Sequence, residues 1–493
     1  MAIAKWLVSH LSLFRYVLAL QLTFLTKISN RSVCRKQYSL IILAAIMKLS
    51  SHAEVFDDVI HAEHEAARVY RKIAMRIVPL LLICYIVSYF DRVNLSFAKL
   101  HFLPDLGLNE AVYGIAAALF YVTYVLFEVP SNLYMQRVGA RATLVRIMLI
   151  WGTVTMAMSL ITTPNQLYIA RLVLGAAEAG FFPGVILYLS FWFPSAYRAR
   201  ITSLFIMGIP ISGMIGGPLA GWIMHDLAGN HGMKGWQLLF LYEGLPPILL
   251  GFFAFFYLND RVSDAKWLSN REKAIVLGNL RAEQRMKETF TQSQKIPMLK
   301  DFRVYAAILA YFAICCGTGA MSFWMPTLIK GLDISDIRII GWLSAIPYLT
   351  ATVGLWIIGR HSDRTGERRW HVACCLIASA IGFALLGSAN GNAPLTISLL
   401  ALAATGLYGA VSVFWSIPTA YFSKTSAAGG IALVSSMGCI GGFASTVFIG
   451  WIKGLTGSVG MAMGAVGVIM VIGALVLLIA YPASLLREKS QAR

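Results

Sequence analysis

Four ionisable residues lie in the middle of long apolar segments, where charge is hardest to accommodate. Asp91 and Arg92 lie in YIVSYFDRVNLSFA, and Arg171 and Glu178 lie in LYIARLVLGAAEAGFFPG. A charged side chain at the centre of a bilayer costs on the order of 2.5–3.5 kcal/mol even on the mildest scales. Such residues persist where they face a water-filled cavity or one another, so we predict that these four bind an anion and a proton.

The residue types fit that chemistry. An arginine guanidinium grips a carboxylate with a planar fork of N–H groups. A carboxyl group partly removed from water can exchange protons near neutral pH. Protonation of Asp91 and Glu178 would remove negative charge beside the arginines, so proton and anion would favour each other's binding.

Spacing constrains how these side chains meet. Arg171 and Glu178 are seven residues apart and share one helix face. Asp91 and Arg92 point about 100° apart, so both reach a cavity only near its edge or at a helix break, which Asn94 would support. The alternative is a static set of buried ion pairs that fixes helix packing, and such pairs are weak evidence of stabilisation.

The elements that carry these residues follow from composition. The chain has 493 residues, of which 58% are hydrophobic and 13% charged, with a mean hydropathy of +0.69. Ordinary soluble proteins are about a quarter charged. Apolar segments near the roughly 20 residues that cross a bilayer must form helices in lipid. We predict an all-α membrane protein of about twelve transmembrane helices, centred on 75–98, 112–135, 143–162, 166–191, 201–224, 237–258, 303–328, 338–360, 371–389, 394–420, 428–451 and 460–481.

Domain boundaries follow from the polar stretches between these segments. We predict an N-terminal extension and tail (1–72), a six-helix bundle (73–258), a charged cytoplasmic linker (259–301), a second six-helix bundle (302–482) and a tail (483–493). Residues 1–46 carry six basic groups and no acid, and Met47 begins a normal membrane-protein start. Our hypothesis is that 1–46 arises from a mis-called start codon; the alternative is a targeting or amphipathic membrane-surface segment.

The formal charge of +18 comes from Lys and Arg spread over short loops, which argues against nucleic-acid binding. Their bias to one side predicts a multi-pass protein of the plasma (inner) membrane with both termini cytoplasmic. The seven cysteines have neither CxxC nor Cys/His ligand spacing. We therefore expect no metal, no disulfide framework and no cofactor.

One loop carries a family resemblance. GRHSDRTGERR (359–369) resembles the signature loop of the major facilitator superfamily at Gly359, Asp363, Arg364, Gly366, Arg368 and Arg369. A degenerate copy, NLYMQRVGAR (132–141), has Gln136 where an acid is usual. The resemblance implies two six-helix bundles that rock about a central site. It also implies that Asp363 and Arg364 bond across cytoplasmic helix ends and help to lock one conformation.

Several further strings resemble the anion:cation symporter family, whose members carry tartrate, phthalate, hydroxyphenylacetate and sugar acids. They are DRVNLS (91–96), YVLFEVPSN (124–132), ARLVLGAAEAGFFPG (170–184), FWFPSAYRAR (191–200) and GWQLLFLYEGLP (235–246). The resemblance implies that Asp91 and Glu178 are protonated and that Arg92 and Arg171 bind the substrate carboxylate or act in gating. It makes Tyr124 a substrate-binding residue, and we add Asn94 and Ser435 as candidate contacts.

Two departures from this pattern bear on the substrate. Met207 stands where members that bind sugar acids can have Gln, and Ser435 and Cys439 stand where Asn is common. Fewer amides leave fewer partners for substrate hydroxyls, which favours a smaller or more apolar carboxylate. We expect one or two aromatic residues to stack on an aromatic acid, among the candidates Phe181, Phe182, Trp324, Tyr348, Phe414 and Trp415.

The sequence thus predicts a monomeric secondary transporter that imports an organic carboxylate (tartrate-like, aromatic or sugar acid) with protons. A first alternative is a proton-coupled antiporter that exports drugs or metabolites. A membrane-embedded enzyme is disfavoured because HExxH, GxSxG in context and Asp-rich metal motifs are absent. A sensor would be expected to carry an added signalling domain. Outside the central group, Glu128 is predicted to pair with a loop arginine.

Overall fold

The computed structural model describes residues 32–291, 301–389, 391–421 and 427–482, all of which form helices and their connections. Residues 72–493 form one compact unit, and residues 1–71 form another, of which the described part is the beginning of helix α2. The predicted C-terminal tail and residues 1–31 of the predicted extension lie outside the described residues.

The helices follow one another with short connections. The first half of the chain contains α2 (Ser32–Asp105), α3 (Glu110–Val138), α4 (Ala140–Ala157), α5 (Pro164–Glu178), α6 (Phe181–Ser190), α7 (Ser195–Asp226) and α8 (Gly235–Tyr257). The linker contains α9 (Asn270–Thr291). The second half contains α10 (Phe302–Lys330), α11 (Ile337–Thr365), α12 (Arg369–Leu385), α13 (Ala393–Phe414), α14 (Ser416–Tyr421), α15 (Ala427–Thr456) and α16 (Val459–Ala480). The described residues also contain four single-turn 3₁₀ segments, at Met158–Leu160, Asn230–Gly232, Val262–Asp264 and Leu386–Ser388.

The predicted helical membrane architecture is confirmed. Within the described residues, twelve helices are long and apolar enough to cross a membrane, from Glu63–Asp105 to Val459–Ala480. Each coincides with one of the twelve predicted segments. Eight of those spans lie within single helices. The fourth is made of α5 and α6, the third and the ninth end in a 3₁₀ turn, and the tenth ends in α14.

Capping residues explain where several helices begin. The Asn109 side chain accepts a hydrogen bond from the backbone N–H of Val112, and Thr163 and Gln166 form a capping box ahead of α5. Asp336 caps α11 in the same way. Each cap satisfies an N–H group that the helix itself cannot, which is worth about 0.5–2 kcal/mol.

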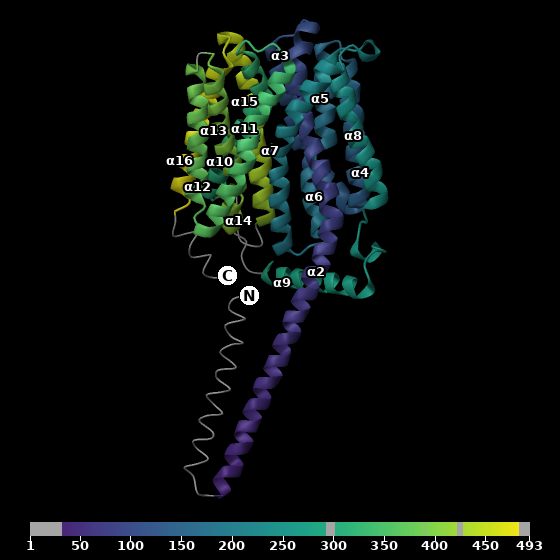
Figure 1. Ribbon diagram of the computed structural model, residues 1–493, viewed down its shortest axis with the longest axis vertical. Helices are drawn as coiled ribbons and strands as arrows, with labels where there is room; N and C mark the ends of the chain where they lie inside the picture. The colour runs from purple at the N-terminus through teal and green to yellow at the C-terminus, as the bar shows by residue number, and fades with distance from the viewer. Residues whose placement is uncertain (1–31, 292–300, 390, 422–426, 483–493) are drawn as a thin grey trace. The chain divides into compact units, whose positions relative to one another are not determined.

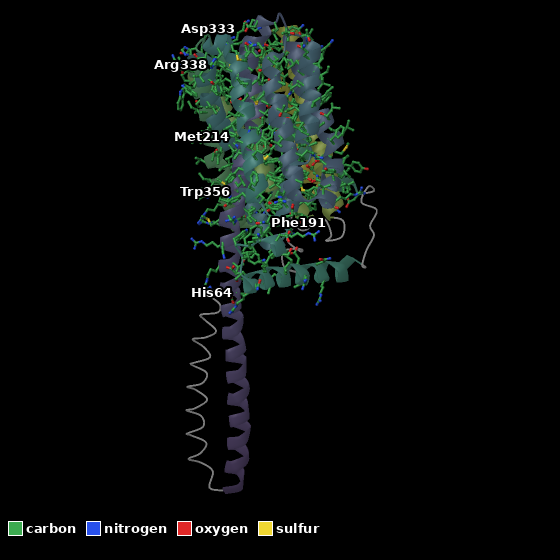
Figure 2. The ribbon with its side chains drawn as sticks, turned by 90° about the vertical axis from the view of Figure 1, so that its right-hand side faces the viewer. His64, Phe191, Met214, Asp333, Arg338 and Trp356 are labelled. Atoms are coloured by element: carbon green, nitrogen blue, oxygen red, sulfur yellow. The ribbon has the colours of Figure 1, made fainter. Side chains whose placement is uncertain are left out.

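The bundle has two ends that recur below. We call the end formed by connections 106–109, 227–234 and 331–336 the far end, and the opposite one, next to α9, the linker end (Figure 1). Figure 2 shows Asp333 and Arg338 at the far end, and Phe191 toward the linker end. Helices α3 and α7 of the first half pack on α15 and α11 of the second, so these four helices form most of the contact between the halves among the described residues.

Two glycines bring α7 and α11 into backbone contact. A Cβ at Gly341 would lie 2.5 Å from the carbonyl oxygen of Gly217, and a Cβ at Gly217 would lie 2.8 Å from that of Gly341. Any larger residue would force the helices apart. Here the backbones of the two halves approach closely because both residues at the contact are small, which is common between membrane helices.

The linker is anchored to the first half. Asp260 accepts a hydrogen bond from the backbone N–H of Arg141 at 2.8 Å, and it lies against Gly139, which has a φ of 104°. Tyr188 donates to the carbonyl oxygen of Asn259 at 2.8 Å. The degenerate loop 132–141 thus lacks an acid at Gln136 but is met by a carboxylate from the linker.

The loop that resembles the family signature (359–369) is held by contacts among its own residues. Gly366 ends α11 with a φ of 68°, a left-handed conformation that glycine adopts readily. Asp363 pairs with Arg368 at 2.6 Å, and Arg368 also donates to the Ser362 hydroxyl. A Cβ at Gly359 would have one neighbour within 4 Å, the Ser412 hydroxyl of α13. The roles of Asp363 and Arg364 as a conformational lock remain a prediction.

The outer surface of the bundle is apolar. Large hydrophobic side chains are strongly exposed there, including Trp342 (66%), Trp356 (55%) and Phe256 (82%), and Trp356 projects at the edge of the bundle in Figure 2. An apolar surface of this extent is stable only in contact with lipid. It therefore fits a protein whose helices span a bilayer.

Candidate functional site

The four predicted residues form two ion pairs inside the first half. Arg92 of α2 lies 3.2 Å from the Glu178 carboxylate at the end of α5. Arg171 of α5 lies 3.3 Å from the Asp91 carboxylate of α2. We call these four residues the central cluster. The four residues lie together, as predicted, and each ion pair joins one residue of α2 to one residue of α5.

The two pairs differ in environment. Arg171 and Asp91 are buried (0% and 3% exposed), and the Thr155 hydroxyl of α4 donates to Asp91 at 3.0 Å. Arg92 retains 11% exposure beside a Glu178 with 2%. Asp91 therefore points into the first half of the chain, and Arg92 points toward the second half, as neighbours about 100° apart on a helix can.

One aromatic ring contacts both positive charges. The Phe120 ring of α3 lies under both guanidinium groups, 5.0 Å from Cζ of Arg92 and 4.8 Å from Cζ of Arg171. Tyr89 flanks Arg92 on another side at 4.5 Å. Such contacts are worth about 0.5–2 kcal/mol each and fix the plane of the guanidinium.

Arg92 lines a central cavity between the halves of the chain. Two adjoining spaces of about 120 Å³ each share Tyr89, Arg92, Tyr124, Tyr311 and Cys439. The first is also lined by Glu178, Glu128 and Ser435. Tyrosine hydroxyls, one guanidinium and two carboxyl groups thus face a hollow rimmed by aromatic rings, which is the composition of a site for a small polar organic molecule.

A helix break positions Glu178 at this cavity. Helix α5 ends at Glu178, and α6 starts at Phe181 after Gly180, whose φ is 84°. A Cβ at Gly180 would lie 2.6 Å from Ser131 of α3. Glycine is therefore required there both by its left-handed φ and by the lack of space for a side chain. Interrupted helices are typical of transporter binding sites. Of the two possibilities for the first span, a position at the cavity edge or a helix break supported by Asn94, the break is absent, because α2 is helical through Asp105.

The structure divides the predicted substrate contacts. Arg92, Tyr124 and Ser435 line the central cavity, and so does Glu178. Asn94 is fully buried, with no hydrogen-bond partner for its amide among the described residues, and is not part of the lining. Of the aromatic candidates, three belong to the lining: Phe181, Phe182 and Trp415.

Three further polar residues lie near the central cluster in ways that the sequence did not predict. Glu128 lines the cavity and accepts a 3.5 Å hydrogen bond from Ser436 of the second half, where a pairing with a loop arginine was expected. Glu243 of α8 is 7% exposed and has no partner for either carboxylate oxygen among the described residues, although Asp91 acts on it electrostatically. Nothing in the sequence marks Thr155, which fixes Asp91.

The halves are tied together mainly at the far end. Tyr113 donates to the carbonyl oxygen of Phe323 at 2.8 Å. Lys453 forms an ion pair with Glu110. Two further ties at this end are Lys330 to the carbonyl oxygen of Leu100 at 2.9 Å and Arg338 to Asp226 at 3.4 Å. The central cavity therefore lies behind a closed far end in this conformation.

Comparison with known proteins identifies the family to which the chain belongs. A family model described as Major Facilitator Superfamily matches residues 81–446. The chain belongs to the major facilitator superfamily. It is a secondary transporter of small metabolites rather than an enzyme, and the membership predicted from loop 359–369 is confirmed.

The chain matches several relatives named as transporters over nearly their whole length. "Putative metabolite transport protein NicT" of Pseudomonas putida is 40% identical over 90% of this chain and 100% of its own. A "Putative tartrate transporter" of Agrobacterium vitis is 41% identical over 84% and 94%. A "Quinolone resistance transporter" of Acinetobacter baumannii is 38% identical over 86% and 97%. The crystal structure of a D-xylose-proton symporter has the same fold, with a TM-score of 0.66 at 15% identity over 83% of this chain and 98% of that one.

The cluster geometry predicts different effects for two buried acids. Asp91→Asn would leave the Arg171 guanidinium buried without a counter-charge, which costs about 3–5 kcal/mol. Glu243→Gln removes a carboxylate that has no described partner and should be nearly neutral. We expect Asp91→Asn to lower the apparent melting midpoint of the purified protein by several degrees, with Glu243→Gln near wild type. Equal midpoints for Asp91→Asn and wild type would contradict the dependence of Arg171 on this pair.

Proposed function

We propose that this transporter carries an organic carboxylate together with protons, and that the carboxylate binds Arg92 in the central cavity. The observation that carries the proposal is the Arg92–Glu178 ion pair at the cavity wall. The only guanidinium lining the cavity in the described part of the chain is held by an internal carboxylate. A substrate carboxylate must compete with Glu178 for it.

Competition for one guanidinium couples the two solutes. When Glu178 takes up a proton, its attraction to Arg92 falls and the planar N–H fork becomes available to the substrate. When the substrate leaves, Arg92 again favours the ionised form of Glu178, which releases the proton. Proton and anion therefore promote each other's binding by the same free energy.

The Asp91–Arg171 pair supports this exchange from behind the wall. Arg171 has two guanidinium nitrogens and Glu178 one carboxylate oxygen without partners among the described residues. Movement of Glu178 away from Arg92 would bring it under the influence of Arg171, which acts on it electrostatically. We infer that Asp91 is a second protonation site that shares charge with Glu178 through Arg171.

The cavity lining favours a small or aromatic acid. Besides Arg92, the polar groups are mostly tyrosine hydroxyls, with Ser435 and Cys439 and without Asn or Gln among the lining residues. Phe181, Phe182 and Trp415 provide apolar surface. A heavily hydroxylated sugar acid would find few amide partners there.

The arrangement in the membrane is part of the proposal. Basic residues in the connections near the linker end support a cytoplasmic location for that end and for both termini, in the plasma (inner) membrane. The closed far end would then face outward. We infer that bundles 73–258 and 302–482 rock about the cavity as a monomer, with linker 259–301 between them and Asp363, Arg364 and Arg368 at the gating loop.

Export in exchange for protons is the second candidate, favoured by the relative named as a quinolone resistance transporter. A proteoliposome uptake screen with an imposed pH gradient separates the two. The panel contains tartrate, aldonates, phthalate, hydroxyphenylacetate, short dicarboxylates and a fluoroquinolone. Symport predicts accumulation of an acid when the inside is alkaline. Accumulation of the fluoroquinolone when the inside is acidic would contradict it.

Arg92→Lys tests the guanidinium fork. The variant keeps the charge but loses the planar pair of donors, so we expect at least about a tenfold rise in the half-saturating concentration of the transported acid. Arg146→Lys is the matched control, because Arg146 lies in α4, donates to Ser131 and does not line the cavity. An unchanged affinity in Arg92→Lys would rule out Arg92 as the carboxylate site.

Glu178→Gln tests the proton carrier. Glutamine cannot ionise, so the substrate still reaches Arg92 but no proton accompanies it. We expect counterflow exchange of labelled for unlabelled acid to persist, while accumulation driven by a pH gradient is lost. Glu243→Gln makes the same change at a buried carboxyl off the cavity and should still accumulate the acid. Gradient-driven accumulation by Glu178→Gln would show that another group carries the coupled proton.

A further inference from the structure

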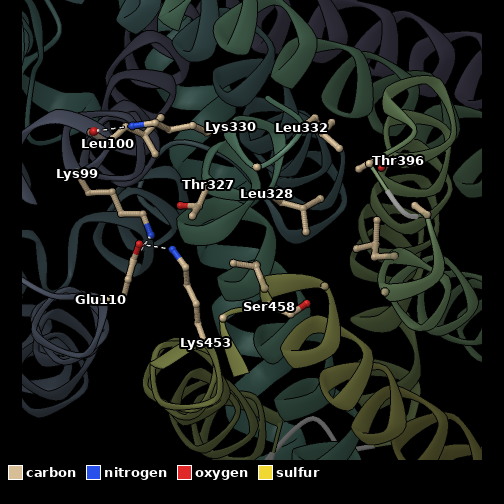
Figure 3. Close-up of a pocket in the computed structure, with 18 of the residues that line it drawn as sticks. Lys99, Leu100, Glu110, Thr327, Leu328, Lys330, Leu332, Thr396, Lys453 and Ser458 are labelled. Carbon is tan, nitrogen blue, oxygen red and sulfur yellow. Dashed lines mark hydrogen bonds and ion pairs between the residues drawn. The ribbon is translucent and has the colours of Figure 1, made fainter. Parts of the chain in front are cut away.

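A second, larger cavity lies at the far end of the bundle, with a volume of about 550 Å³. Its walls come from the ends of α2 and α3 in the first half and from α10, the α12–α13 connection and the α15–α16 turn in the second. Figure 3 shows its polar side chains, which are Lys99, Glu110, Thr327, Lys330, Thr396, Lys453 and Ser458. It is separate from the central cavity, with which it shares no lining residue.

The lining of this far-end cavity carries excess positive charge. Three lysines and one glutamate are its only charged members among the described residues. Glu110 is shared by Lys99 at 2.9 Å and by Lys453, as the dashed lines of Figure 3 show. Lys330 donates to the carbonyl oxygen of Leu100. Two positive charges therefore face this space without a carboxylate of their own.

One of the lysines is deeply held. Lys99 is 1% exposed, and its ammonium lies 3.8 Å from the Trp324 ring centroid and 4.0 Å from that of Tyr113. Burial of an ammonium at this depth is expensive unless anionic or aromatic groups surround it. Lys99 thus lies at the inner wall of the cavity with Glu110 and the two aromatic rings as its partners.

An unsatisfied hydroxyl lies in the same wall. Thr327 is 9% exposed, and its Oγ1 has no hydrogen-bond partner among the described residues. It comes from α10 between Lys330 and Trp324, and Figure 3 shows it between Lys99 and Leu328. The Thr327 hydroxyl can donate a hydrogen bond, and the neighbouring ammonium groups can only donate. Together they offer donors to a ligand that is rich in hydrogen-bond acceptors.

We propose that the far-end cavity is a second anion site, which takes a small soluble carboxylate between Lys330, Lys453 and the Thr327 hydroxyl. The bound carboxylate and Glu110 compete for Lys453. Because the Glu110–Lys453 pair joins the two halves, an anion that draws Lys453 away loosens the closure of this end. The site attracts the anion and favours opening toward it, and neither property depends on Arg92.

Malonate is the probe, and Arg92→Gln protein is the background, so that the central cavity contributes nothing to the signal. Binding is followed by titration calorimetry and by tryptophan fluorescence, because Trp324 contacts Lys99. We expect saturable malonate binding with a fluorescence change that Trp324→Phe removes. Lys330→Gln combined with Lys453→Gln should weaken malonate binding at least about tenfold.

Glu110→Gln gives the sharper test. It removes the internal competitor, so malonate should bind several-fold more tightly, whereas a merely structural Glu110 would leave binding unchanged or weaker. Arg338→Gln is the matched control, since Arg338 also ties the halves at this end but lies outside the cavity. Malonate affinity that is the same in the double lysine variant as in its parent, or that falls in Glu110→Gln, would overturn the proposal.

An anionic lipid headgroup would satisfy the same lysines, and the choice of bilayer separates the two sources. The titrations are run in nanodiscs of phosphatidylcholine alone and again with phosphatidylglycerol added. A site for a soluble carboxylate predicts the same malonate affinity in both, within about twofold. Loss of malonate binding in the phosphatidylglycerol discs would assign the site to lipid and overturn the proposal.

Discussion

The ion pair between Arg92 and Glu178 is the interaction on which the rest of the site depends. A buried guanidinium requires a counter-charge, because an unpaired charge in a low-dielectric interior is destabilising by several kcal/mol. At the cavity wall that requirement can be met by Glu178 or by an incoming carboxylate. A single site that must always be filled, by one anion or another, is the physical basis of the proposed coupling.

The surrounding structure holds this pair in a position where exchange is possible. Helix α5 ends at Glu178, so the Glu178 carboxylate lies at the cavity, and Gly180 permits the turn into α6. Phe120 contacts both guanidinium groups with its ring. Asp91, fixed by the Thr155 hydroxyl, neutralises Arg171, so that only Arg92 is offered to the cavity. Each neighbour thus limits the competition to one guanidinium.

The sequence predicted the fold better than the site. Twelve apolar segments and the signature loop were sufficient for the helices and the family, because hydropathy and helix length are local properties. Charges at membrane depth identified the central cluster. Which acid pairs with which arginine depends on rotation of α2 against α5, a tertiary property, so the inward direction of Asp91 was not foreseen. Likewise, Glu128 and the far-end lysines gain meaning only when the halves are assembled.

Proton uptake on binding tests the central claim most directly. Calorimetric titration of the transported acid into purified protein, in buffers of different ionisation enthalpy, counts the protons taken up with each anion. The competition at Arg92 predicts uptake of about one proton per anion near neutral pH in the wild type, and a much smaller uptake in protein with glutamine at position 178. Binding without net proton uptake in the wild type, or equal uptake in both proteins, would contradict the account.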